Sequence, residues 1–209
     1  SGTELGLLTS LSLGFTAIST ILTGWISDLV DRKLMFLIGA FIGILVPLTY
    51  ILVPSFIWLI PAFLFAGISD GIIQPSWTAM YANSIRNKQR GAIYGLTNVF
   101  ILTPVLFAGL VGGKIVSMSG GLTLKGIRPV YYLQGILLLI AWILVYTRLG
   151  KRVPTQPEKR LTFKTMLNDY GNVLSRKGVR SWIGMKSLGS LSIGLAGPFW
   201  MLYAAQVLG

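Results

Sequence analysis

Long uncharged, apolar stretches alternate with charged segments along the whole chain. Such stretches cover residues 5–27, 34–69, 91–113, 129–147 and 187–209. A helix of about 20 residues spans the hydrocarbon layer of a bilayer, so each stretch is long enough to cross it. The second stretch is too long for one crossing and contains Pro54 and Ser55; continuing it past Asp70 to Ser84 divides it into two. The pattern predicts six membrane spans.

The apolar stretches are continuous rather than alternating, which favours helices over the strands of a membrane barrel. Hydrophobic residues make up 53% of the chain and charged residues 11%, which also departs from the composition of a soluble domain. The predicted fold class is therefore an all-α, polytopic membrane helix bundle. Cys and His are absent, which excludes disulfides and thiol or imidazole catalysis and leaves no metal site to predict. One acid inside the spans provides no carboxylate pair, so an intramembrane enzyme is disfavoured.

The net charge of +12 is distributed unevenly over the loops. Fifteen of the eighteen Lys and Arg residues lie in or beside the first, third and fifth loops, and three lie in the others. This asymmetry predicts that loops one, three and five are cytoplasmic and that both ends of the chain lie outside. We interpret the basic residues as topology determinants and contacts for anionic headgroups, and we expect no nucleic-acid partner. Because the chain begins at Ser1 rather than Met, we expect a fragment of a longer cell-membrane protein.

A charged motif joins the first two spans. Residues 24–33 read Gly-Trp-Ile-Ser-Asp-Leu-Val-Asp-Arg-Lys. This segment resembles the Gly-x-Leu-x-Asp-x-x-Gly-Arg-Lys signature between the second and third helices of the major facilitator superfamily. Its Gly24, Asp28, Arg32 and Lys33 match the signature, and Asp31 replaces the usual Gly. An acid such as Asp28 near the start of the next helix complements the helix dipole and can pair with Arg32.

A second stretch extends the resemblance. Residues 67–77 read Gly-Ile-Ser-Asp-Gly-Ile-Ile-Gln-Pro-Ser-Trp, and a basic loop ends in Arg90 and Gly91. They are similar to the family's fourth helix and the loop before its fifth. The resemblance implies three parts. Residues 1–149 would be helices two to six of the N-terminal half, 150–181 the cytoplasmic central loop, and 182–209 the first helix of the C-terminal half. In the loop, apolar positions between Phe163 and Leu174 predict an amphipathic tether helix.

Two departures from family patterns limit what the resemblance implies. The fourth helix lacks the Arg of many proton-coupled members. The antiporter motif of the fifth helix is half present, with Gly109 where Pro is usual. Efflux and uptake therefore both remain open. Glycines four residues apart recur at positions 39 and 43, 67 and 71, 91 and 95, and 109 and 113. We interpret these pairs as helix-packing positions.

Asp70 is the only acid well inside a span, and a charge at bilayer depth usually faces a cavity or a partner. Asp70, Gln74, Trp77 and Tyr81 share one helix face by their spacing. We predict that this face lines a substrate pathway and that Asp70 can carry a coupling proton. The alternative is a structural acid that pairs with an Arg or Lys on a helix outside this chain. Further candidates are Thr16 in a hydroxyl stripe of the first span, Asn98 and Gln134 on later spans, and Trp200 on the last.

The resemblance implies a secondary transporter of a small solute that works by alternating access. Gly24, Asp28, Arg32, Lys33 and Arg90 would form its cytoplasmic gating segment. We expect no cofactor, a coupling ion that is H⁺ or Na⁺, lipid and solute as partners, and a monomer when the protein is complete. The alternatives are a non-transporting sensor on the same scaffold and a permease subunit of another transporter family.

Overall fold

The computed structural model describes residues 2–26, 30–52, 56–85, 90–149, 171–172, 175 and 177–196. Its regular elements are the α-helices α1 (Gly2–Ile26), α2 (Arg32–Leu52), α3 (Leu59–Ser84), α4 (Arg90–Met118), α5 (Leu124–Arg148) and α7 (Lys177–Ala196), and a 3₁₀ turn, η1 (Phe56–Trp58). The described residues contain no strand. The predicted all-helical fold class is confirmed.

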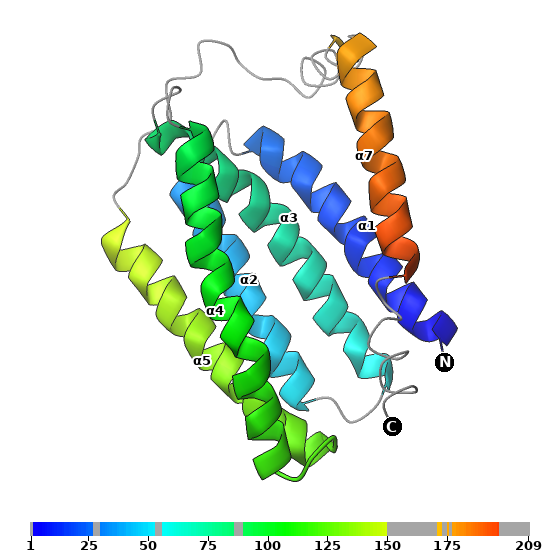
Figure 1. Ribbon diagram of the computed structural model, residues 1–209, viewed down its shortest axis with the longest axis vertical. Helices are drawn as coiled ribbons and strands as arrows, with labels where there is room; N and C mark the ends of the chain where they lie inside the picture. Colours follow the sequence, from blue (N-terminus) through cyan, green and yellow to red (C-terminus); the bar gives the residue numbers. More distant parts are fainter. Residues whose placement is uncertain are drawn as a thin grey trace. The chain divides into compact units, whose positions relative to one another are not determined.

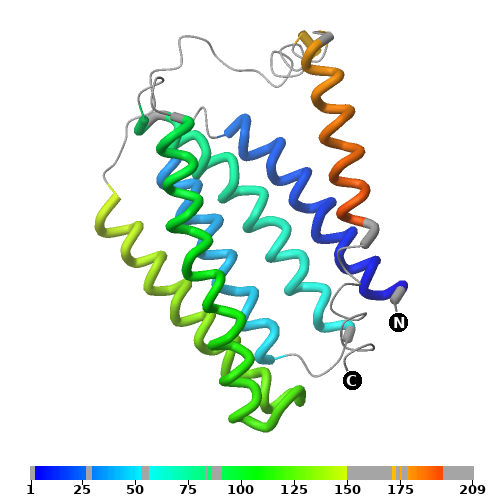
Figure 2. The backbone as a smooth tube through the Cα atoms, in the orientation of Figure 1, coloured from blue at the N-terminus to red at the C-terminus, as the bar shows by residue number. Residues whose placement is uncertain are grey.

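Five of these helices, α1 to α5, are long and apolar enough to cross a membrane. They correspond to the first five predicted spans, and successive helices run in opposite directions (Figure 2). The sixth predicted span, 187–209, is described only as far as Ala196, inside α7. The predicted tether helix lies almost wholly outside the described residues. The three-part division of the chain stays a prediction.

Helices α4 and α5 extend beyond the uncharged stretches that predicted them. α4 runs to Met118, past Lys114, and α5 begins at Leu124, before Lys125 and Arg128. The start of α5 is set by Thr123, whose side chain accepts a hydrogen bond from the Gly126 backbone N–H and caps the helix. Gly120 and Gly121 take positive φ angles in the tight turn before it. Charged turns of this kind lie outside the hydrocarbon layer, so a search for uncharged runs misses them.

By its contacts the chain divides into Leu11–Pro154 and a second unit of Ser1–Ser10 with Thr155–Gly209. In the first unit, α2 packs against α3 on one side and α5 on the other, and α4 packs on α5 (Figure 1). Its core is therefore centred on α2. Pro47 of α2 is fully buried, and Trp142 of α5 donates from its indole Nε1 to the Leu37 carbonyl of α2 at 2.9 Å.

Close contacts at glycine hold α3 between two neighbours. A Cβ at Gly39 of α2 would lie 2.9 Å from Ile72 Cγ2 of α3, and one at Gly43 would lie 2.8 Å from Ser69 Oγ. On the other side, a Cβ at Gly67 would overlap the Ser12 carbonyl oxygen of α1. A Cβ at Gly71 would lie 2.5 Å from Ser19 Cβ of the same helix. These two predicted packing pairs are confirmed. The pairs 91 and 95, and 109 and 113, face open space among the described residues.

Candidate functional site

A polar strip runs along α3, the helix that is most covered by its neighbours. Between Pro61 and Ile85 the exposed side chains of the described residues are Asp70, Gln74, Trp77, Thr78 and Ser84. None of them is aliphatic. We use the name polar strip for Asp70, Gln74 and Trp77, which follow one another at intervals of four and three residues on one face. The structure thus places these three predicted pathway residues together.

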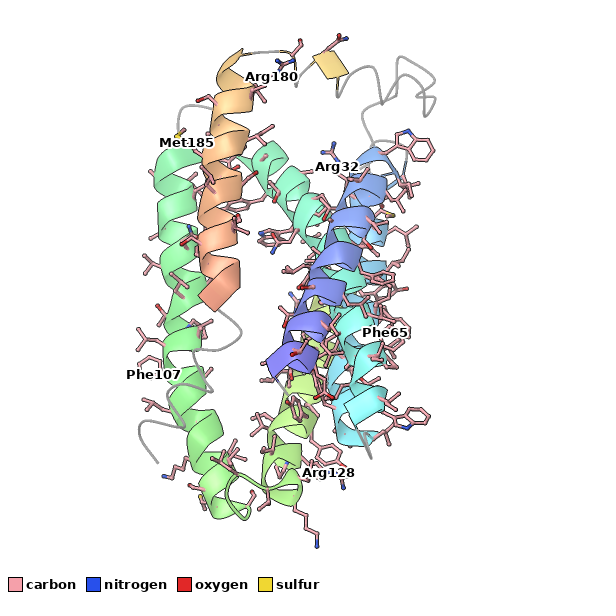
Figure 3. The ribbon with its side chains drawn as sticks, turned by 90° about the vertical axis from the view of Figure 1, so that its right-hand side faces the viewer. Arg32, Phe65, Phe107, Arg128, Arg180 and Met185 are labelled. Atoms are coloured by element: carbon pink, nitrogen blue, oxygen red, sulfur yellow. The ribbon has the colours of Figure 1, made fainter. Side chains whose placement is uncertain are left out.

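Most of the exposed side chains of α4 are apolar. Leu96, Phe100, Leu106 and Leu110 are each at least 59% exposed, and Phe107 points away from the other helices of its unit (Figure 3). Such a surface suits lipid, because acyl chains offer no hydrogen bonds. An exposed carboxyl, amide and indole in the middle of a membrane helix suit water or a polar ligand instead. The polar strip is therefore the candidate site.

A chain of aromatic rings lies at the Trp77 end of the strip, near the connection between α3 and α4. The Trp77 ring stacks on Tyr81, with centroids 5.7 Å apart and an interplanar angle of 8°. Phe36 of α2 lies 6.0 Å from Trp77, and Tyr94 of α4 lies 5.0 Å from Tyr81. The Tyr81 hydroxyl donates to the Ile93 carbonyl at 3.2 Å and shares a hydrogen bond with the Thr97 hydroxyl. The rings that support Trp77 thus come from three different helices.

Thr16 is placed in the contact between α1 and α3. Its hydroxyl donates to the Ser12 carbonyl of its own helix at 3.0 Å, and its carbonyl would lie 2.7 Å from a Cβ at Gly71. The Thr20 hydroxyl is likewise bonded to the Thr16 carbonyl. Hydroxyls bonded in this way have one donor fewer for a solute. The contacts of Thr16 are therefore those of packing, and they lie beside Asp70 rather than on the strip.

The other pathway candidates lie on helices other than α3 or outside the described residues. Asn98 is exposed on α4 one residue after Thr97, which turns it about 100° around the helix from the contact with Tyr81. Gln134 is exposed on α5. Trp200 lies outside the described residues.

The gating segment is described in part. Gly24 is half-buried near the end of α1, Arg32 opens α2, and Arg90 opens α4. Asp28 and the side chain of Arg90 lie outside what the structure describes, so the predicted ion pairs remain untested. Arg32 lies at the opposite end of the helices from Arg128 (Figure 3). Asp31, which replaces the signature Gly, has a clear local role. Its Oδ1 accepts a hydrogen bond from the Lys33 backbone N–H at 2.9 Å and caps α2.

Lys33 makes a long-range contact that the sequence did not predict. Its Nζ donates to the Tyr146 carbonyl at 2.9 Å and to the Leu149 carbonyl, both at the end of α5. It also lies 5.9 Å from the centroid of the Tyr146 ring, which stacks on Trp142. An ammonium group at a helix C-terminus binds the last carbonyls and complements the helix dipole. Lys33 therefore joins the gating segment to α5.

Helices α1 to α5 are apolar and joined by short connections, with a basic motif between α1 and α2 and a polar strip along α3. Together these features define a polytopic membrane protein. A family model described as Major Facilitator Superfamily matches residues 1–209, the full length of the chain. The chain therefore belongs to this superfamily of membrane transporters, and the resemblance drawn from the two motifs is confirmed. A comparison with curated proteins gave no match.

Proposed function

We propose that this chain moves a small solute across the cell membrane by alternating access, with the polar strip of α3 as part of the pathway. The observation that carries the proposal is the exposure of Asp70, Gln74 and Trp77 on a helix whose other sides are packed against α1 and α2. A transporter needs polar groups at membrane depth that a solute can reach, and such groups are expensive to keep against lipid.

We further propose that Asp70 carries the coupling proton. A carboxyl at this depth is neutral when protonated and charged when it is not, so a protonation cycle changes the cost of exposing it to each side. Among the described residues Asp70 makes no ion pair. The gating segment would stabilise one of the two access states from the cytoplasmic face.

The test measures uptake in proteoliposomes of the complete protein carrying this chain, with an imposed pH gradient and a panel of labelled sugars, organic acids, amino acids and amines. A solute that accumulates identifies transport and separates it from the alternative of a sensor, which binds without accumulation. Asp70→Asn should abolish accumulation driven by the pH gradient, because the amide cannot exchange a proton. Asp70→Glu keeps the carboxyl and is the matched control. Unchanged pH-driven accumulation by Asp70→Asn would rule out the role of Asp70.

A further inference from the structure

The membrane-embedded parts of α1 to α5 contain one charged residue. Residues 5–26, 34–52, 59–84, 91–113 and 129–147 include Asp70 and no Lys, Arg or Glu. These ranges coincide with the described helices apart from their charged ends. An ionised carboxylate inside a bundle is stable when a cation accompanies it. These five helices contain the anion of such a pair and not the cation, which leaves two sources for it: a basic residue of another helix or a cationic ligand.

An aromatic surface lies two helical turns from that carboxylate. Trp77 follows Asp70 by seven residues, a rise of about 10 Å along α3, and its side chain is 40% exposed. The ring is held on one side by the stacked Tyr81 ring and approached by Phe36. Because Tyr81 is itself bonded to α4, the indole has a supported position. A supported, exposed indole attracts flat apolar groups and positive charge.

Gln74 occupies the position between the two groups on the same face, and its side chain is exposed. The strip therefore presents, in order, a carboxylate, an amide and an aromatic ring over about 10 Å. An organic anion would meet the negative charge of Asp70 with no basic side chain inside the five spans to offset it. A neutral sugar could use the amide and the indole, but it would leave the carboxylate without a counter-charge.

We propose that the polar strip binds an organic cation, with a protonated amine or amidine on the Asp70 carboxylate and a flat aromatic or apolar body over Trp77. This inference rests on the proposed function, since it names the class of solute that the strip would pass. It assigns charge recognition to Asp70 and recognition of the apolar body to Trp77.

The first test needs no variant. The complete protein carrying this chain, in lipid nanodiscs, is titrated with ethidium, a fluorescent aromatic cation. Three compounds that share one ring but differ in charge then compete with it: 2-naphthylmethylamine, 2-naphthylmethanol and 2-naphthoate. We expect the amine to displace ethidium at a concentration at least about tenfold lower than the other two. Equal or better displacement by the alcohol or the carboxylate, or no ethidium binding beyond that of empty nanodiscs, would overturn the proposal.

The second test uses paired variants. Asp70→Asn should raise the Kd for ethidium at least about tenfold, while Asp70→Glu should stay within about threefold. Trp77→Leu should raise it roughly 2- to 30-fold, and Trp77→Phe by less. Glu4→Gln and Trp58→Leu make the same chemical changes away from the strip and should leave the Kd unchanged. Asp70→Glu keeps the carboxylate and Trp77→Phe keeps an aromatic ring, although both change the size of the side chain. An effect confined to Asp70→Asn and Trp77→Leu therefore reflects the loss of the charge or the ring and not misfolding.

The two proposals fail in different ways. If ethidium binds through Asp70 and Trp77 but no amine accumulates in proteoliposomes, the strip is a cation site and the transport proposal fails. If a sugar or an organic acid accumulates while ethidium and the naphthyl amine do not bind, transport stands and the cation proposal fails.

Discussion

At the scale of single residues, Lys33 and Asp31 show how a short loop motif is used twice. Asp31 caps the start of α2 through its carboxylate, and Lys33, two residues further on, reaches the end of α5. The first contact could be anticipated, because an acid just before a helix is a common cap. The second could not, because nothing in the local pattern connects position 33 with positions 146 and 149.

Lys33→Met tests the contact with α5. The substitution keeps the length and apolar stem of the side chain but removes the donors to the Tyr146 and Leu149 carbonyls. We expect a loss of about 1–2 kcal/mol in local stability, seen as faster hydrogen exchange of the amides at positions 145–149. Lys114→Met removes an exposed ammonium at the end of α4 and is the control. Equal exchange in the two variants would show that Lys33 does not hold the end of α5.

At the scale of elements, glycine spacing predicted two helix contacts correctly and left two open. The pairs on α2 and α3 meet a neighbouring backbone or side chain closely, whereas those on α4 do not among the described residues. Spacing identifies a small-residue face but not whether another helix of the chain covers it. The same limit applies to Thr16, because a hydroxyl stripe has the same periodicity whether it lines a pathway or packs on α3.

Gly71→Ala tests the contact between α1 and α3. Its Cβ would lie 2.5 Å from Ser19 Cβ and 2.7 Å from the Thr16 carbonyl oxygen, so α1 must move. We expect a loss of about 1–3 kcal/mol in the free energy of unfolding, measured as a lower melting temperature in detergent. Gly14→Ala places a methyl group on α1 where no described residue lies within 4 Å, and it should leave the melting temperature unchanged. Equal melting temperatures for the two variants would show that α1 does not pack closely on Gly71.

The shared helix face of Asp70, Gln74 and Trp77 could be predicted from the sequence. Intervals of four and three residues place these side chains on one face of a helix. The sequence alone does not show that this face is exposed. That exposure depends on Gly67 and Gly71 bringing α1 to one side of α3 and on Ser69 bonding to the Gly39 carbonyl of α2 on another.

At the scale of the whole molecule, the charge asymmetry predicts which ends of the helices face the cytoplasm. The chain contains no Cys, so a single introduced cysteine is its only thiol. We expect an impermeant maleimide to label Leu122→Cys, which replaces a side chain that is 90% exposed in the turn between α4 and α5, in intact cells. Gln156→Cys should be labelled only after the membrane is opened. The reverse pattern would invert the predicted orientation.

Asp28→Asn tests the proposed gating segment. Loss of this charge should slow the change between access states, so transport rates should fall while the amount of protein in the membrane stays the same. Asp31→Asn makes the same chemical change three residues away and keeps an N-cap acceptor, so it should transport normally. A normal rate for Asp28→Asn would remove Asp28 from the gating segment.

The bond from Lys33 to the end of α5 also bears on the order of events during synthesis. The partners are 113 and 116 residues apart in the sequence, so the contact cannot form until α5 has left the ribosome. Until then the ammonium group of Lys33 lies at the membrane surface, where water can solvate it. The last turn of α5 then binds it, which fixes α5 beside α2 only after α1 to α4 have been made.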